Sequence, residues 1–548
     1  MRSALKAFLL CTLFAFLLSG CNSASRTSQS TPPPTNQNPP PSNGSVDVVT
    51  YHNDIARTGQ NLSEATLTTA NVNSSSFGKI AVFSVDGKVD AEPLYLSALS
   101  VGEATHNVLF VVTEHDNVYA FDADSGTVLW KVSMLQSGET TSDTRSCSQV
   151  VPEIGITSTP VIQRSMGPHG TIYLVSMSKD NSGAYHQRLH ALDVTTGSEQ
   201  FGGPVAIQAS FPGTGDNATA GKVVFDPAQY EERSGLLLLN GVIYTSWTSH
   251  CDNRPYTGWV ISYDATTLVQ KSVLNLTPNG NEGAIWMAGA GPAADSSGNI
   301  YVLDANGSFD STLDTNGFPS QKDFGNAFLK LSTTSSQLAV ADYFEMSNEL
   351  QENDTDIDLG SGGAMVLPDL TDGTGNVKHL TIGAGKDANI YVVNRDNMGK
   401  FNANTNNIYQ EIQGQLAGSV FSMPAYFNNT VYYGAVGDNI KAFPITNAQL
   451  ASTPKSKSTH AFGYPGATPS ISANQASNGI IWVTENSSPA VLHAYDATDL
   501  SKELYNSSQA TGGRDNFGDG NKFITPMIAN GKVFVGTTNG VGVFGLLH

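Results

Sequence analysis

The chain has 548 residues, and 28 Lys and Arg stand against 48 Asp and Glu, which gives a formal net charge of −20. Such an acidic chain offers no electrostatic footprint for phosphate backbones, which argues against nucleic acid as a partner. With 53 Gly, 25 Pro and only 14% charged residues, the composition predicts an all-β protein rich in turns.

Residues 1–20 have the pattern of an export signal. MRSALK carries two positive charges, AFLLCTLFAFLL is apolar, and LSGC follows. The apolar run is too short for a stop-transfer helix. LSGC resembles the bacterial lipobox, which implies cleavage before Cys21 and a lipid on that cysteine. The alternative is an ordinary signal peptide with an incidental cysteine.

The next segment, residues 21–46, consists mainly of Ser, Thr, Asn and Pro. This composition predicts a disordered tether. Asn22 follows the cysteine, and by resemblance to lipoprotein sorting rules it favours the outer membrane. We therefore expect an exported cell-envelope protein that is attached to a membrane through its lipid, with its folded part at 47–548.

The folded part repeats one pattern of strands and turns. VYAFDADSGTVLW at 118–130 has weaker copies in LHALDVTTGSEQF from Leu189, VISYDATTL from Val260 and LHAYDATDL from Leu492. Six units open with a proline, as in AEPLYL at 91 and STPVIQ at 158, and the proline fits the first residue of a strand. Two more, from Leu236 and Gly362, lack it but keep the strands.

These eight units predict the architecture. A four-stranded antiparallel sheet cannot bury both of its faces alone, and repeated sheets of this kind stack radially. The sequence therefore predicts an eight-bladed β-propeller over 47–548. FGKIAVFSV, at about 77–85, belongs to no unit, and the last unit is one strand short. We predict that this early strand pairs with the C-terminal strand GVGVFGLL and completes the last blade.

The repeat carries a resemblance to a known family. VYAFDADSGTVLW resembles the tryptophan-docking repeat of the pyrroloquinoline-quinone (PQQ) propellers, with Trp130 at the docking position and Phe201 in its place in the second unit. Residues 57–80 also resemble the lead-in to the first blade of those proteins. The resemblance implies the propeller fold, and the family includes quinoprotein alcohol dehydrogenases and a non-enzymatic lipoprotein that assists outer-membrane protein assembly. The fold alone does not choose between these functions.

The dehydrogenase hypothesis can be compared with its chemistry. In the enzymes of this family the quinone lies between a tryptophan and a ring of two adjacent cysteines, is bound to Ca²⁺, and acts with an Asp base. Trp286 and Glu153 could supply the tryptophan and a calcium carboxylate, but this sequence has no adjacent cysteines and no aligned Asp base. We expect a binding or assembly platform without a certain cofactor, and keep a PQQ-dependent alcohol or sugar dehydrogenase with Ca²⁺ as the alternative.

Loops that enter the innermost strands of a propeller share one face and crowd its axis. The acidic character of these loops suits a cation or a polyhydroxylated ligand, so we expect a carbohydrate or an envelope protein as partner, and a monomer. For any single carboxylate the alternative is that it caps a turn. The candidate ligand-binding residues are Asp90, Glu92, Glu153, Trp286, Asp356, Asp358, Arg514, Asp519 and Lys522.

Two cysteines remain in the folded part. Cys147 lies in the loop entering the second unit and Cys251 between two strands of the third, which places both on the same face of adjacent blades. In an exported protein this favours a disulfide, and two separate buried thiols are the alternative. The short motifs around His250 and Glu114 offer too few ligands to predict a metal site.

Overall fold

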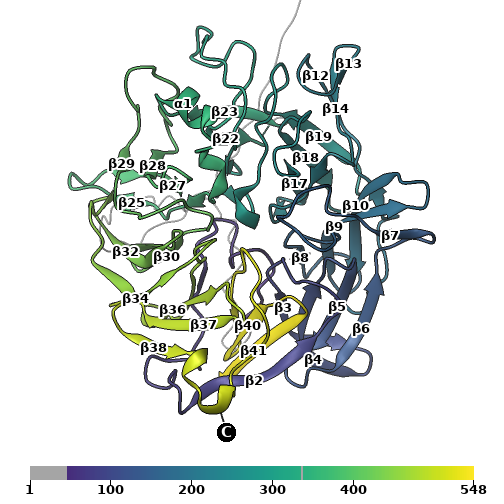
Figure 1. Ribbon diagram of the computed structural model, residues 1–548, viewed down its shortest axis with the longest axis vertical. Coiled ribbons are helices and arrows are strands. Elements are labelled where there is room, and N and C mark those ends of the chain that lie inside the picture. The colour runs from purple at the N-terminus through teal and green to yellow at the C-terminus, as the bar shows by residue number, and fades with distance from the viewer. Residues whose placement is uncertain (1–45, 335–336, 548) are drawn as a thin grey trace, which may run out of the picture. The chain divides into compact units, whose positions relative to one another are not determined.

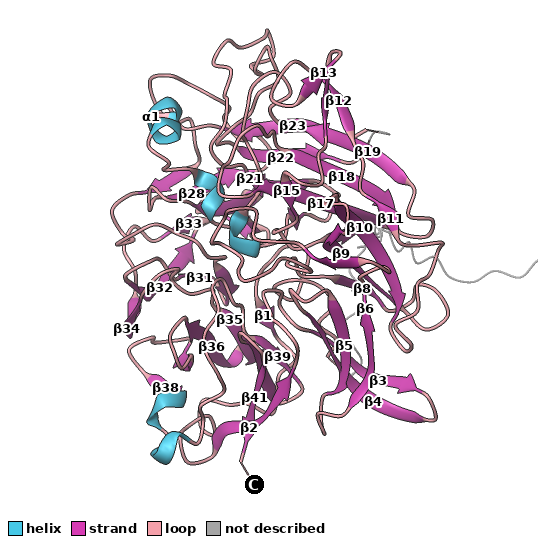
Figure 2. Cartoon of the chain, turned by 45° about the vertical axis from the view of Figure 1, so that its right-hand side comes forward, coloured by secondary structure: helices cyan, strands magenta, loops and turns pink. Residues whose placement is uncertain are grey.

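The computed structural model describes residues 46–334 and 337–547. The predicted export signal, Cys21 and the tether before residue 46 lie outside the described residues. No helix among those described is long and apolar enough to span a membrane. Strands dominate the described residues, and helical structure within them is confined to α1 (Glu349–Asp354) and four short 3₁₀ turns, η1 (Met287–Gly289), η2 (Leu359–Ser361), η3 (Ser507–Gln509) and η4 (Thr511–Gly513) (Figure 2).

The described strands form eight main sheets, which follow one another around the centre of Figure 1 and which we number 1 to 8 in chain order. Their strands pair antiparallel, except that β1 pairs with β35 in parallel. Sheet 1 contains β3 (Leu94–Val101), β4 (Ala104–Val112), β5 (Asn117–Asp122) and β6 (Val128–Ser133), and sheet 2 contains β7 (Glu139–Thr141), β8 (Val161–Gln163), β9 (Thr171–Asp180), β10 (Tyr185–Asp193) and β11 (Val205–Ala206). Sheet 3 contains β15 (Tyr230–Glu231), β16 (Leu237–Leu239), β17 (Val242–Ser249), β18 (Trp259–Asp264) and β19 (Gln270–Asn275), and sheet 4 contains β20 (Ala293–Ala294), β21 (Ile300–Leu303), β22 (Phe328–Ser332) and β23 (Ala339–Phe344).

The other four sheets repeat this plan. Sheet 5 contains β24 (Met365–Val366), β27 (Leu380–Ala384), β28 (Ile390–Asn394) and β29 (Gln410–Ile412), and sheet 6 contains β30 (Ala425–Phe427), β31 (Thr430–Tyr433), β32 (Asp438–Thr446), β33 (Gln449–Leu450) and β34 (Ser456–Phe462). Sheet 7 contains β1 (Gln60–Asn61), β35 (Ser470–Asn474), β36 (Ser477–Glu485), β37 (Val491–Asp496) and β38 (Glu503–Asn506), and sheet 8 contains β2 (Phe77–Ser84), β39 (Met527–Ala529), β40 (Lys532–Gly536) and β41 (Gly540–Leu546). Two small sheets lie outside them. One is three-stranded and contains β12 (Ser210–Pro212), β13 (Ala218–Thr219) and β14 (Lys222–Val224), and the other is a hairpin of β25 (Leu370–Thr371) and β26 (Val377–Lys378).

The repeated Asp-Thr-Gly segment is a turn held by its own side chain. Asp193 Oδ1 accepts hydrogen bonds from the backbone N (2.8 Å) and hydroxyl (2.6 Å) of Thr195, and Gly197 then takes a positive φ of 69°. A Cβ at Gly197 would lie 2.8 Å from the ring of Trp130. Trp130 also donates through its indole N to Val194 O (3.0 Å). The predicted docking of Trp130 on the next sheet is therefore confirmed.

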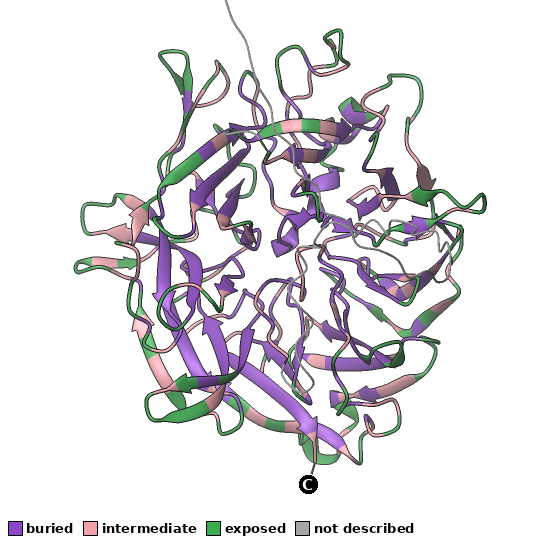
Figure 3. Cartoon of the chain, turned by 180° about the vertical axis from the view of Figure 1, so that it is seen from behind, coloured by how far each residue is buried: buried purple, intermediate pink, exposed green. Residues whose placement is uncertain are grey.

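Apolar side chains join each sheet to the next. Six buried clusters connect sheets 1 and 2, sheets 2 and 3, sheets 3 to 6, sheets 6 and 7, sheets 7 and 8, and sheets 8 and 1. Buried residues follow the strands, whereas exposed residues gather in the peripheral loops (Figure 3). The predicted all-β, propeller-type fold is confirmed.

The last sheet is completed by the early strand. β2 pairs antiparallel with β41, from Phe77 opposite Leu546 to Ser84 opposite Gly540. The predicted pairing of the two strands is therefore confirmed. Phe83, near the end of β2, packs against Gly126 in the turn of sheet 1, where a Cβ would lie 2.6 Å from its ring. One strand thus connects the last sheet to the first.

Residues 48–64, which we call the axial segment, touch all eight sheets, a feature that the repeat pattern does not predict. Their contacts fall in or next to one strand of each sheet, namely β3, β8, β16, β20, β24, β30, β35 and β39. Backbone bonds reach sheets 1, 2, 4, 5, 6 and 7 through Val48 with Tyr95, Val49 with Ile162, Ile55 with Ala294, Ala56 with Val366, Thr58 with Tyr426, and Gly59 with Ile471. Side chains reach sheets 3 and 8, where Arg57 donates to Leu236 O (3.2 Å) and Asn61 to Ile528 O (2.9 Å).

Candidate functional site

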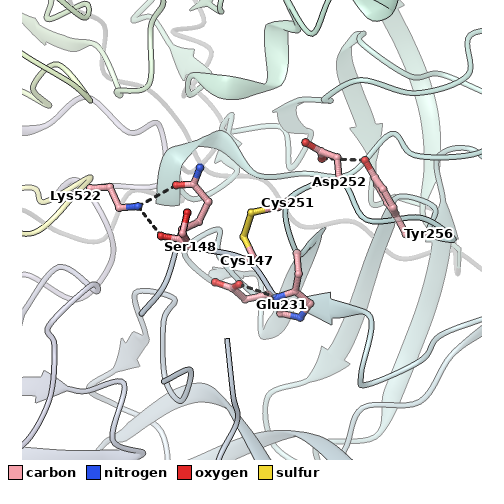
Figure 4. Close-up of a disulfide and its surroundings, with 9 residues drawn as sticks. Cys147, Ser148, Glu231, Cys251, Asp252, Tyr256 and Lys522 are labelled. Carbon is pink, nitrogen blue, oxygen red and sulfur yellow. Dashed lines mark hydrogen bonds and ion pairs between the residues drawn. A yellow bond between two sulfur atoms is a disulfide. The ribbon is translucent and has the colours of Figure 1, made fainter. Parts of the chain in front are cut away.

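The disulfide predicted between Cys147 and Cys251 is present, with the two Cα atoms 5.4 Å apart (Figure 4). It joins the loop between β7 and β8 of sheet 2 to the loop between β17 and β18 of sheet 3. The alternative of two separate thiols is wrong. Lys522, from the loop entering sheet 8, reaches the same place and donates to Ser148 O and Gln149 Oε1, both at 3.1 Å. Loops from three sheets therefore meet at the disulfide.

Beside these loops lies a buried acidic cluster, made of Asp90, Glu114 and Glu231. All three side chains are buried, and one carboxylate oxygen of each has no hydrogen-bond donor among the described residues. Burial raises the pKa of Glu114 well above its usual range, and the charge of Asp90 raises it further. Buried carboxylate oxygens without donors favour a proton, a cation or a hydroxyl-bearing ligand.

Five side chains from the loops entering sheets 3, 4, 6, 7 and 8 form what we call the axial mouth, made of Arg233, Trp286, Phe421, Tyr464 and Phe523. Trp286 meets Phe421 and Phe523 edge to face at centroid distances of 5.9 and 4.9 Å. Tyr464 contacts Phe421 at 5.5 Å and is 45% exposed. These rings give the mouth an apolar wall that is open at Tyr464.

Arg233 supplies the positive charge of the axial mouth. Its guanidinium lies 5.4 Å from the centroid of the Phe523 ring, and its Nη2 has no hydrogen-bond partner among the described residues although the residue is buried. Gly289 makes room for it, because a Cβ there would lie 2.4 Å from Arg233 Nη1. Lys522 interacts electrostatically with Arg233 and with Asp90 and Glu231, so the mouth and the buried acidic cluster are neighbours.

Other predicted residues lie near this site but have partners of their own. Asp358 is buried 2.5 Å from Lys386 Nζ, and Asp356 pairs with the same lysine. Burial raises the pKa of Asp358 to about 6 although Lys386 opposes the shift. Lys386 also interacts electrostatically with Tyr464, so this pair borders the axial mouth.

Glu92 faces the axial segment. It accepts a hydrogen bond from His52 N (2.8 Å), and burial raises its pKa to about 8. Its contact is therefore with the protein's own chain, which occupies the place where we expected a ligand.

Three predicted residues bind neighbouring loops instead of converging. Glu153 lies 2.9 Å from His115 Nδ1 and accepts from Thr141 Oγ1 (2.6 Å), and Asp519 accepts from Ser488 Oγ (2.5 Å). Arg514 pairs with Asp515 and donates to Phe77 O at the start of β2, the outermost strand of sheet 8. Its predicted position at the axis is wrong, because its loop turns outward to cover β2.

Sequence reasoning missed most of the residues that do converge, namely Glu114, Glu231, Arg233, Phe421, Tyr464 and Phe523. Arg233 and Glu231 stand in EERSG, directly before the apolar run LLLL. This loop enters the third unit, which lacks the opening proline. The repeat register could have found it, since it occupies the same position as the other entering loops.

The arrangement does not fit the PQQ site that the sequence resemblance implied. Two protein rings already contact Trp286, and the disulfide links residues 104 positions apart in place of neighbouring cysteines. The cavity beside Phe421 and Phe523 has about 10 Å³, room for about one water molecule. We therefore derive no step through a quinone.

Comparison with known proteins supports the fold. No protein-family model and no curated protein matches the sequence. Among solved structures, the chain is similar to quinohemoprotein alcohol dehydrogenase from Comamonas testosteroni (13% identity, 91% of this chain and 80% of that chain, TM-score 0.60). It is also similar to quinohemoprotein alcohol dehydrogenase ADHIIG from Pseudomonas putida HK5 (12%, 91% and 80%, 0.59) and to a europium-containing methanol dehydrogenase (12%, 90% and 90%, 0.54). At these identities the likeness shows the fold alone.

Proposed function

We propose that this protein is a ligand-binding β-propeller that takes a polyhydroxylated ligand, such as a carbohydrate, at its axial mouth. The observation that carries the proposal is the juxtaposition of exposed aromatic surface with buried, donor-free carboxylate oxygens. Aromatic faces pack against the C–H face of a sugar, and carboxylates accept its hydroxyl hydrogens. The guanidinium of Arg233 offers a donor to ring or hydroxyl oxygens.

Tyr464 provides the sharpest test, because it is the most exposed ring of the mouth. We expect a panel of cell-envelope oligosaccharides to contain a ligand that quenches tryptophan fluorescence or gives a calorimetric signal. Tyr464→Ala should weaken its binding at least 10-fold, whereas Tyr464→Phe keeps the ring and should bind nearly as the parent does. A panel without any binder, or equal affinities of the two variants, would contradict the proposal.

The dehydrogenase alternative has a direct test. The purified protein is incubated with PQQ and Ca²⁺, freed of unbound cofactor, and assayed for reduction of an artificial dye with alcohols and sugars. We expect neither cofactor retention nor turnover. Turnover that depends on PQQ would replace the binding proposal with a quinoprotein oxidoreductase.

We further propose that the protein is exported and held on a membrane of the cell envelope through a lipid on Cys21. The support is the LSGC sequence after a short apolar run. In the native host, the parent protein should fractionate with membranes and incorporate a labelled fatty acid. Cys21→Ser should do neither, and a variant that stays lipidated would overturn the assignment.

A further inference from the structure

A second cluster of chemically active side chains lies where sheets 6 and 7 meet. His460 belongs to β34 of sheet 6, whereas Glu485 ends β36 and His493 lies on β37, both in sheet 7. One ligand atom from each of the three residues lies within 4.8 Å of the other two. We propose that these three residues bind a zinc ion that joins the two sheets.

The spacing of the ligand atoms fits this ion. Glu485 Oε2 lies 3.2 Å from His460 Nε2 and 3.6 Å from His493 Nε2. In a tetrahedral site with bonds of 2.0–2.1 Å, neighbouring ligand atoms are about 3.4 Å apart. The cluster therefore needs little movement to accept zinc at its centre.

The buried histidine offers an unused nitrogen. His493 is 1% exposed, and the Nε2 atoms of His493 and His460 face Glu485 Oε2 without meeting it in hydrogen-bond geometry. The two imidazole rings stack with centroids 4.9 Å apart. A buried polar atom without a partner is costly, and coordination to a metal would remove that cost for both rings.

The surroundings fix the buried ring in the orientation that a metal ligand needs. Glu503 Oε1 lies 2.8 Å from His493 Nδ1, so the carboxylate holds the proton on Nδ1 and leaves Nε2 as the free donor of an electron pair. Metal-bound histidines commonly have such a carboxylate behind them. Phe462 packs edge to face on both rings, with centroids 4.9 Å from His460 and 5.2 Å from His493.

The ligand set also indicates the kind of ion. Two imidazoles and one carboxylate suit zinc, whereas calcium and magnesium prefer sites built from oxygens. The side chains of His460 and Glu485 are 37% and 27% exposed, so a fourth position can be taken by water. Since His460 comes from one sheet and the other two ligands from the next, the ion would act as a crosslink between the sheets.

The test uses the full chain, freed of metal with a chelator and then titrated with Zn²⁺ by calorimetry and with Co²⁺ by visible absorption. We expect one ion per chain, the d–d bands of four-coordinate Co²⁺, and a higher midpoint of thermal unfolding with Zn²⁺. His460→Ala should weaken Zn²⁺ binding at least 100-fold and abolish both the bands and the thermal shift.

A matched control is His379→Ala, because His379 lies near two carboxylates, 2.9 Å from Asp396 and 3.8 Å from Asp369, but has no second histidine in such a cluster. It should bind Zn²⁺ as the parent does. His460 is partly exposed, so its replacement leaves a folded protein even if His493→Ala does not. Absence of Zn²⁺ binding by the parent, or equal affinity in His460→Ala, would overturn the proposal without touching the axial mouth.

Discussion

At the scale of single residues, burial decides how the carboxyl groups behave. The Asp side chains of the repeated turns accept hydrogen bonds from the residues that follow them, and such contacts can be expected from the local sequence. Glu92 looks similar in the sequence, yet it is buried against the axial segment and its pKa is raised to about 8. The difference arises from packing between distant segments.

Glu92→Gln tests this burial. Between pH 4.5, the ordinary value of Glu, and about 8, the folded protein keeps a proton on Glu92 that the unfolded chain has lost. Stability from this group therefore falls as the pH rises through that window. Gln carries no such proton and can still accept from His52 N. The variant should gain stability relative to the parent from pH 5 to pH 8, by a few kcal/mol at about 1.4 kcal/mol per pKa unit.

Thermal or chemical unfolding at several pH values measures this difference. Glu103→Gln, at an exposed position, is the control and should follow the parent. A constant difference between Glu92→Gln and the parent over the same pH range would show that Glu92 is ionised throughout.

At the scale of elements, the axial segment is the main departure from a simple repeat. The fully buried Arg57 donates to Thr50 Oγ1 (2.7 Å), Tyr51 O (2.8 Å) and Pro292 O (2.9 Å), as well as to Leu236 O. The guanidinium thus pairs carbonyl groups from within the segment and from the loops entering sheets 3 and 4. The sequence resemblance at 57–80 pointed to a lead-in to the first blade, but not to contacts with every sheet.

Arg57→Ala should therefore destabilise the protein by about 3–5 kcal/mol, because it leaves several buried carbonyl groups without donors. Denaturant unfolding gives the free energy, and hydrogen exchange should rise at both β16 of sheet 3 and β20 of sheet 4. Arg254→Ala removes an arginine that is 51% exposed and pairs with Asp216, and it should cost about 1 kcal/mol or less. Similar losses in both variants would contradict the role of the axial segment.

At the scale of the whole molecule, two long-range links supplement the packing of sheet on sheet. The pairing of β2 with β41 joins the beginning and the end of the propeller, and the Cys147–Cys251 disulfide joins sheets 2 and 3. Apolar clusters connect every sheet to its neighbours. The two links therefore add to a structure whose sheets are already packed against one another.

Replacing both cysteines, Cys147→Ser with Cys251→Ser, should lower stability by about 4–5 kcal/mol at most, as the chain-entropy model gives for a closed loop of about 100 residues. Denaturant unfolding with and without a reductant measures the loss. The parent should approach the double variant when reduced, and the double variant itself should not respond to the reductant. If reduction leaves the parent unchanged, the disulfide contributes nothing to stability.

The sequence by itself determined the repeat, the strand that completes the last sheet, and the cysteine pair. These features follow from local chemistry, since a proline begins a strand, an Asp side chain holds the turn after it, and the position of a segment within each unit fixes the face on which it lies. Only the tertiary structure decided which side chains converge. Arg233, Tyr464 and Phe523 come from three sheets, His460 and His493 from two, and the axial segment passes all eight. Such contacts depend on how sheets pack against one another, and no interaction between residues close in the chain encodes that packing.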